Sequence, residues 1–238
     1  MEEPTVSPER AIGWLRRFGY LLDIILVAIA SPALEMGVRF IARPTTFGTD
    51  LLVTALAQLL NVGAVCFLIH VRGERLAELG LKWPDSWLRT VLTAVMLAAA
   101  YFAIVAVSEH LGYRRNLSAF GAVRGNAALT LMAVLYSFVA AGFTEEFMFR
   151  GFLLHRLAGL FRFGRGAWMV AVVVQGMLFG LAHAYQNPVG IFLTGGFGIA
   201  AGFVFLTLGR NLWPLIIGHG LYDAARFILF YFYGPPTS

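Results

Sequence analysis

The sequence predicts an all-α membrane protein, a transmembrane bundle of about seven helices and between about six and eight at the limits. Of its 238 residues, 59% are hydrophobic and only 13% are charged, and the mean hydropathy is +0.75. A soluble domain of this length normally carries about 25% charged residues. Several apolar runs reach the roughly 20 residues that a helix needs to cross a bilayer. Lipid rather than water is therefore expected to surround most of the chain.

The helices are predicted from apolar runs that alternate with short basic connections. Each run is long enough to cross the hydrocarbon region, and the five tryptophans lie near the predicted helix ends, as interfacial anchors do. The N-terminus lacks the apolar core of a signal peptide, so we expect the first run to remain a membrane helix. The predicted helices cover residues 18–42, 50–71, 87–108, 127–154, 168–187, 189–209 and 212–233.

Basic residues gather in alternate connections, where they indicate topology rather than nucleic-acid binding, and no nucleic-acid partner is expected. On one predicted face lie Arg10, Arg16, Arg17, Arg72, Arg75, Lys82, Arg89, Arg156, Arg162, Arg165 and Arg210. The positive-inside rule assigns this face to the cytoplasm, together with a polar N-terminal segment at 1–17. The opposite face keeps Arg39, Arg43, Arg114, Arg115 and Arg124, which argue against that assignment. We expect an integral protein of the cell membrane with its N-terminus in the cytoplasm.

The fourth predicted helix carries three charged residues inside its apolar run, in FVAAGFTEEFMFRGFLL. A charge at mid-bilayer costs about 2.5–3.5 kcal/mol, so such residues are rarely without a role. Glu146 and Arg150 stand four residues apart and can pair on one helix face. Glu145 points about 100° away, which leaves its carboxylate free to act as a general base. An ion-paired kink near the interface explains this cluster equally well.

Two further polar clusters lie in later apolar runs. Phe179 and His183 occur in GMLFGLAHA, where a lone histidine is more often a packing or interfacial residue than a functional one. His219 and Asp223 stand four apart near the middle of the last run, and they could simply hydrogen-bond each other. Together the three clusters supply a base, a water-orienting group and an oxyanion donor, which are the groups that hydrolysis needs.

Three short motifs contain these residues. EEFMFR fits EExxxR, FGLAH fits FxxxH and HGLYD fits HxxxN/D. In this order and on separate apolar helices, they resemble the CPBP or Abi family of intramembrane proteases. That family includes type II CAAX prenyl endopeptidases and lysostaphin-resistance-type membrane proteins. The resemblance covers about residues 127–225. It implies a catalytic membrane core at 127–233, preceded by membrane helices with a basic amphipathic loop at 18–126 and followed by a tail at 234–238.

The resemblance also implies a role for each motif residue. Glu145 would be the general base, and His183 would help it to hold the attacking water. His219 would donate a hydrogen bond to the oxyanion together with residue 223. Asp223 departs from the asparagine of CAAX endopeptidases, and an ionised aspartate can only accept a hydrogen bond. We therefore expect Asp223 to orient His219. Supporting roles fall to Glu146, Arg150 and Phe179.

A metal ion is an open alternative. The family has been described as metalloproteases, and Glu145, His183 and His219 could hold zinc with an open position. No pair here has the HExxH spacing, however, and the resemblance to prenyl endopeptidases favours a glutamate mechanism. The only cysteine, Cys66, excludes a thiolate cluster. We expect no cofactor, with zinc as the alternative.

The expected activity is hydrolysis of a peptide bond near the membrane, and two other functions compete with it. The chain could be a non-catalytic immunity factor or scaffold in which the motifs serve only structure. It could also be an ion or proton transporter, where intramembrane carboxylates and histidines are common. The absence of an internal repeat and the clustering of polar residues in one half favour a single localised site. The expected partners are a protein or peptide substrate, with or without a lipid modification, and membrane lipids.

Overall fold

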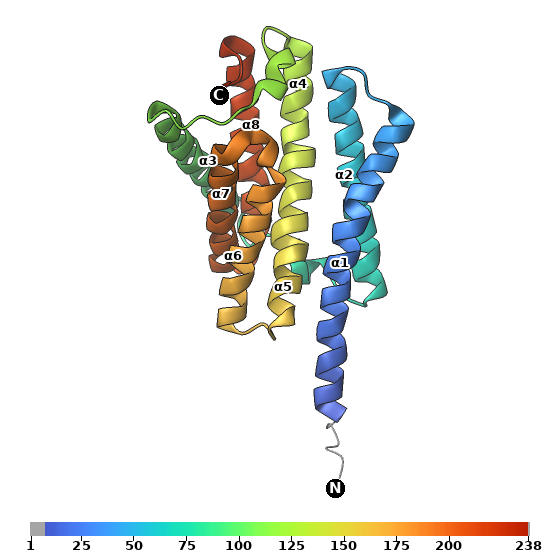
Figure 1. Ribbon diagram of the computed structural model, residues 1–238. Helices are drawn as coiled ribbons and strands as arrows, with labels where there is room; N and C mark the ends of the chain where they lie inside the picture. The colour runs from blue at the N-terminus through green and yellow to red at the C-terminus, as the bar shows by residue number, and fades with distance from the viewer. Residues whose placement is uncertain (1–7, 238) are drawn as a thin grey trace.

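The computed structural model describes residues 8–237, which form helices and connections and contain no strand (Figure 1). Within the described residues, seven helical stretches are long and apolar enough to cross a membrane. They are Gly13–Ala42, Phe47–Val71, Trp87–His110, Ala127–Leu160, Arg165–Ala182, Ala184–Thr207 and Trp213–Tyr233. The prediction of an all-α bundle of about seven spans is confirmed, and the protein is an integral membrane protein.

Between residues 8 and 237, eight α-helices and several shorter segments build these spans. The α-helices are α1 (Pro8–Ala42), α2 (Phe47–Val71), α3 (Trp87–His110), α4 (Ala127–Tyr136), α5 (Leu154–Leu160), α6 (Arg165–Ala182), α7 (Asn187–Thr207) and α8 (Trp213–Tyr233). Two π-helical segments, η3 (Ser137–Glu145) and η4 (Phe147–Leu153), join α4 to α5 in one long span. Short 3₁₀ turns are η1 (Leu76–Leu79), η2 (Ser118–Val123) and η5 (Ala184–Gln186).

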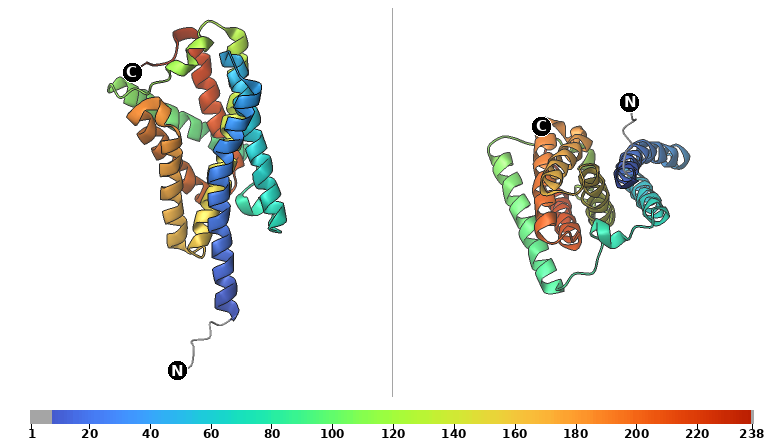
Figure 2. Two further views of the ribbon diagram at one scale, coloured as in Figure 1. Left: turned by 45° about the vertical axis from the view of Figure 1, so that its right-hand side comes forward. Right: turned by 90° about the horizontal axis from the view of Figure 1, so that it is seen from below.

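The spans form three groups when they are viewed along the bundle. Figure 2 shows the group from α4 to α8 in the centre, with α3 on one side and the pair α1 and α2 on the other. Helix α8 packs against α3, α4 and η3, while α6 packs against α7. The connections 72–86, 161–164 and 208–212 lie toward the end where α1 begins, and 43–46 and 111–126 lie at the other end (Figure 1).

The helix ends differ from the expected ones in two informative places. Helix α1 begins at Pro8, inside the expected polar segment 1–17, because helix formation continues beyond the apolar run that marks the lipid span; residues 1–7 lie outside the described part of the chain. Helix α6 ends at Ala182 instead of 187, because Asn187 has a φ of 74° and precedes a proline, which disfavours helical backbone. His183 therefore lies at a helix end.

Helix α1 is attached to the rest of the bundle through a buried ionic cluster. The carboxylate of Asp23, 1% exposed, lies 2.5 Å from Nη2 of Arg72 on one side. Its other oxygen lies 3.0 Å from Nε of Arg156, which also pairs with Glu74 at 2.7 Å. These contacts join α1 to α5 and to the connection that follows α2. Asp23 is thus a buried, ion-paired residue with a structural role, and it lies far from the motif residues in the sequence.

Helices α6 and α7 approach closely because glycines face each other. A Cβ atom at Gly176 would lie 2.5 Å from the side chain of Ile199, and one at Gly180 would lie 2.5 Å from the carbonyl oxygen of Ile191. A Cβ atom at Gly198 would lie 2.9 Å from the Cα atom of Gly176. Small residues allow such close packing of helices in lipid. The contact fixes the end of α6, where His183 begins the turn into α7.

Candidate active site

The two adjacent glutamates lie in an unusual stretch of backbone. The fourth span is π-helical over Ser137–Glu145 and again over Phe147–Leu153, where the sequence pattern predicts an ordinary α-helix. π-Helical turns are rare and are frequent at functional sites, because the wider turn redirects side chains. Glu145 ends the first π segment, and Glu146 separates the two.

Two glycines bring this span against α8. A Cβ atom at Gly142 would lie 2.6 Å from the carbonyl oxygen of Ile216, and one at Gly220 would lie 2.5 Å from the ring of Phe138. Neither contact leaves room for a side chain. The close approach of η3 and α8 places Glu146 beside His219.

Glu146 is the centre of a buried polar network. Its side chain is 0% exposed, and Oε1 accepts a hydrogen bond from Nη1 of Arg150 at 3.1 Å. The same oxygen lies 2.9 Å from Nδ1 of His219. Because an ionised carboxylate only accepts, Nδ1 of His219 carries the proton in this contact. Glu146 therefore holds both the arginine of the first motif and the histidine of the third.

Arg150 and Phe179 connect the first two motifs. The guanidinium carbon of Arg150 lies 4.2 Å from the centre of the Phe179 ring, a cation–π contact in a fully buried setting. The ring of Phe179, 1% exposed, also lies 4.6 Å from the ring of His183, centre to centre. The supporting position predicted for Phe179 thus corresponds to a packing contact between the ion pair and His183.

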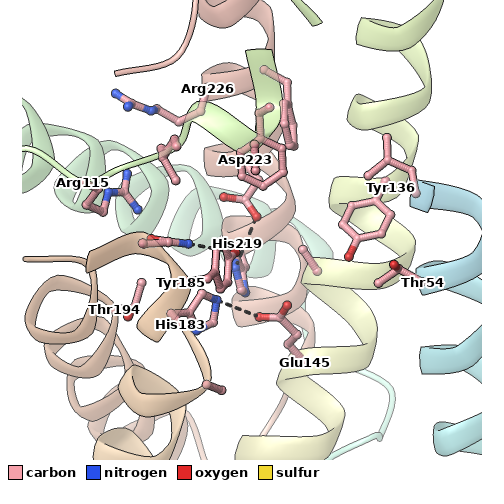
Figure 3. Close-up of a pocket in the computed structure, with 18 of the residues that line it drawn as sticks. Thr54, Arg115, Tyr136, Glu145, His183, Tyr185, Thr194, His219, Asp223 and Arg226 are labelled. Carbon is pink, nitrogen blue, oxygen red and sulfur yellow. Dashed lines mark hydrogen bonds and ion pairs between the residues drawn. The ribbon is translucent and has the colours of Figure 1, made fainter. Parts of the chain in front are cut away.

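Glu145 and His183 face each other across a short gap. Oε2 of Glu145 lies 4.0 Å from Nε2 of His183, and this carboxylate oxygen is buried without a hydrogen-bond partner in the described residues (Figure 3). Nδ1 of His183 lies 2.8 Å from the carbonyl oxygen of Phe179, so Nδ1 donates and Nε2 is left as an acceptor. Two acceptors separated by 4.0 Å leave a position for a group that donates to both.

His219 turns its second nitrogen toward Asp223. Nε2 of His219 lies 3.5 Å from Oδ2 of Asp223, one helical turn further along α8. His219 is 8% exposed, while the side chain of Asp223 is 28% exposed. The contact is longer than the one from Glu146, so Glu146 is the closer carboxylate partner of this imidazole.

All four predicted catalytic residues line one cavity of about 610 Å³. Figure 3 shows Glu145, His183, His219 and Asp223 entering it from the fourth span, the end of α6 and helix α8. Phe149, Phe179 and Phe197 contribute apolar wall. The three motifs, which are far apart in the chain, therefore meet in a single chamber.

The cavity extends toward one end of the bundle. Residues of the connections and helix ends on that side line it, among them Phe47, Arg115, Ala119, Gln186 and Phe230. No described residue of the connections 72–86, 161–164 and 208–212 lines it. Most of the basic residues that were predicted to share a face lie in or beside those connections. The cavity thus extends away from the end of the bundle that holds these three connections and most of the basic residues.

The site residues do not form a metal-binding set as they are placed. In residues 8–237, no group of three His, Cys, Asp or Glu is arranged to hold a metal ion. Nδ1 of His219 is engaged by Glu146, and its Nε2 faces Asp223. Only Nε2 of His183 and the carboxylate of Glu145 remain directed at a shared position, and a zinc site needs at least three protein ligands.

Besides the π-helical backbone, sequence reasoning missed two features of the site. The contact between Glu146 and His219 spans 73 positions, and no local spacing can indicate it. Arg115 was counted only as a topological charge, yet it is 5% exposed and lines the cavity. The sequence gives little indication that Arg115 belongs to the site, because this residue lies in a connection without hydrophobic periodicity.

Comparison with known proteins agrees with the motifs. Residues 126–225 match the family model described as type II CAAX prenyl endopeptidase Rce1-like, and this range contains Glu145, His183, His219 and Asp223. No curated protein and no solved structure matches the chain. The protein is thus a helical membrane protein whose second half is similar to a protease family. The resemblance that the three motifs predict is confirmed for this part of the chain.

Proposed function

We propose that the protein is an intramembrane endopeptidase in which Glu145 activates a water molecule for attack on a peptide bond. The proposal depends on one observation. Oε2 of Glu145 and Nε2 of His183 lie 4.0 Å apart in the cavity, which is too far for a hydrogen bond between them. With Nδ1 of His183 donating to the Phe179 carbonyl, both facing atoms are acceptors. A water molecule between them would donate one hydrogen to each and turn its lone pair to the open cavity.

The reaction then follows from general base catalysis. As the water oxygen forms its bond to the carbonyl carbon, Glu145 takes the water proton and the carbonyl oxygen becomes an oxyanion. The C–N bond breaks when the intermediate collapses, and Glu145 returns the proton to the leaving amine. His183 keeps the water in line during the attack and is a positioning group for it.

His219 is the proposed oxyanion donor. Glu146 accepts from its Nδ1, and Nε2 faces the cavity near Asp223. With an imidazolium at this position, the Nε2–H group would move from Asp223 to the developing oxyanion. A fixed donor of this kind binds the developing oxyanion of the transition state more strongly than the neutral carbonyl oxygen of the substrate. Asp223 would hold the imidazolium in place before the substrate carbonyl arrives.

We propose that this chemistry needs no metal ion. The two nitrogens of His219 already face carboxylates, and the Glu145 and His183 pair provides only two ligands. The water is activated by a carboxylate and oriented by an imidazole. This is sufficient for general base catalysis.

We further propose that the N-terminus lies in the cytoplasm of a cell-membrane protein and that the cavity opens on the other side. The basic residues concentrate at the end of the bundle that the positive-inside rule assigns to the cytoplasm. The cavity extends to the opposite end. A substrate would therefore approach as a polypeptide segment on the non-cytoplasmic side. This direction does not favour a prenylated C-terminus in the cytoplasm, although the family description includes prenyl endopeptidases.

Cleavage of a peptide library by the purified protein in detergent tests the proposal. The expected result is products from the wild type and none from Glu145→Gln. Glu35→Gln is the matched control, because Glu35 lines the same cavity but pairs with Arg39 at 2.9 Å. Equal cleavage by the wild type and Glu145→Gln would refute the glutamate mechanism.

A further inference from the structure

Arg115 is a buried cation that lacks a carboxylate partner in the described part of the chain. Its side chain is 5% exposed, and Nη2 donates to the hydroxyl oxygen of Tyr222 at 2.6 Å. Nε has no hydrogen-bond partner among residues 8–237. The other buried arginines differ, because Arg150, Arg156 and Arg226 each have a carboxylate within 3.1 Å.

A charge in this setting is costly unless an anion balances it. Taking a guanidinium out of water carries a large desolvation penalty, and a single hydroxyl acceptor offsets only part of it. The acidic side chains of Asp223, whose charge acts on Arg115, and of Glu109 are engaged with other residues. Asp223 faces His219 at 3.5 Å, and Glu109 pairs with Arg226 at 2.8 Å.

The backbone around Arg115 is fixed from two directions. The amide of Asn116 donates to the carbonyl oxygen of Gln186, and Asn187 Nδ2 donates to the carbonyl oxygen of Arg114, both at 3.0 Å. The amide of Leu117 donates to the carbonyl oxygen of Pro236 at 3.0 Å. The loop that carries Arg115 is thereby attached to the turn after His183 and to the C-terminal tail. The guanidinium is held in place before any ligand binds.

Arg115 also lines the cavity that contains Glu145 and His183. In Figure 3 the guanidinium of Arg115 and the carboxylate of Glu145 belong to different walls of this cavity. A molecule that occupies the chamber can therefore contact both. Since both walls are built from fixed elements, their separation is a property of the fold.

We propose that Arg115 forms a carboxylate-binding subsite that positions the peptide substrate. Nη1 forms no hydrogen bond within residues 8–237, and together with Nη2 it forms the end of the guanidinium fork, whose N–H groups match the two oxygens of a carboxylate. The carboxylate is either the C-terminal group of the substrate or an Asp or Glu side chain. The inference rests on the proposed peptidase function. It implies that the cleaved bond lies at a set distance from this carboxylate.

The test compares three forms of one peptide that the wild type cleaves: the free acid, the C-terminal amide, and a form with its Asp and Glu replaced by Asn and Gln. A charge-assisted hydrogen bond contributes about 1.5–3 kcal/mol, which corresponds to a roughly 10- to 150-fold rise in KM when the recognised carboxylate is removed. Whichever substitution raises KM identifies the source of the carboxylate. In Arg115→Gln this difference should vanish, and kcat should change less than KM.

Two variants guard against a general loss of structure. Arg115→Lys keeps the charge and should retain part of the carboxylate preference. Arg124→Gln removes an exposed arginine from the same connection and should keep the wild-type preference. If Arg115→Gln discriminates between the peptide forms as strongly as the wild type does, the subsite does not exist.

A binding measurement separates this inference from the peptidase proposal. Fluorescence anisotropy with the same labelled peptides is measured on Glu145→Gln and on Glu145→Gln combined with Arg115→Gln. An Arg115-dependent preference for the carboxylate without any cleavage by the wild type would uphold the subsite and refute hydrolysis. Cleavage with no effect of Arg115 on binding or KM would refute the subsite alone.

Discussion

Glu146 accepts a hydrogen bond from His219 across 73 positions of the chain, with 2.9 Å between Oε1 and Nδ1. The same oxygen accepts from Arg150. One carboxylate thus joins two motifs that a linear reading treats as separate. The network is fully buried, so the loss of any member leaves its partners without compensation.

Glu146→Gln should damage both stability and activity. Breaking a buried ion pair by removing one partner costs about 3–5 kcal/mol, because Arg150 would remain as an uncompensated charge. Thermal unfolding in detergent and kcat on a cleaved peptide measure the two effects. Glu109→Gln should cost less, because the side chains of Arg226 and Glu109 are 11% and 25% exposed and water can still reach the charge that remains. A Glu146→Gln protein with wild-type stability and kcat would show that the network is dispensable.

Asp223→Asn should retain substantial activity, within about tenfold of wild-type kcat/KM. Asp223 lies 3.5 Å from His219, and Glu146 already holds the other nitrogen of the ring at 2.9 Å. An asparagine can also donate to an oxyanion, which an ionised aspartate cannot do. Steady-state kinetics on one peptide provide the measurement. A loss as complete as that of Glu145→Ala would give Asp223 a direct part in the chemistry.

Chelators should leave the activity unchanged. The proposed base is a carboxylate, and the described residues provide no three-ligand set. Peptide cleavage after dialysis against EDTA and 1,10-phenanthroline, together with metal analysis of the purified protein, gives the answer. Loss of activity that is restored by added zinc would instead support the alternative with Glu145, His183 and His219 as ligands.

The mouth of the cavity should be accessible from outside the cell. In a Cys66→Ala background, Ala119→Cys places a thiol at an exposed position that lines the cavity, and Asp85→Cys places one at an exposed position in a basic connection. A membrane-impermeant maleimide applied to intact cells should label position 119 but not position 85. Permeabilised cells should show labelling of both. The reverse pattern on intact cells would place the cavity mouth in the cytoplasm.

The sequence was sufficient to predict the bundle because lipid imposes a length and a polarity on every span. It also predicted the Glu146–Arg150 pair, since their spacing of four residues survives in the wider helix. The π-helical backbone could not be predicted, because it depends on how η3 packs against α8 at Gly142 and Gly220. Hydropathy likewise predicts an end of α6 at residue 187 and not at Ala182, since it does not detect the turn before Pro188.

The sequence predicted which residues belong to the site, but it did not predict how their side chains are paired. Motif order indicated that Glu145, His183 and His219 belong together, and the structure brings all three to one cavity. Tertiary packing decides which carboxylate pairs with which histidine, so the sequence could not predict the pairing of His219 with Glu146. The same is true of Arg115, whose burial is set by contacts with Gln186 and Pro236.

Hydrolysis in water enriched in oxygen-18 tests the central claim most directly. The wild type is incubated with a peptide substrate, and the new C-terminus is analysed by mass spectrometry, with Glu145→Gln, His183→Ala and Glu35→Gln in parallel. One oxygen-18 atom should enter the new C-terminal carboxylate that the wild type and Glu35→Gln produce, and none should enter the product with the new amino terminus. Glu145→Gln and His183→Ala should yield at least about a hundredfold less product, as expected for loss of a general base or of its water. Wild-type rates of oxygen-18 incorporation by Glu145→Gln would contradict the account.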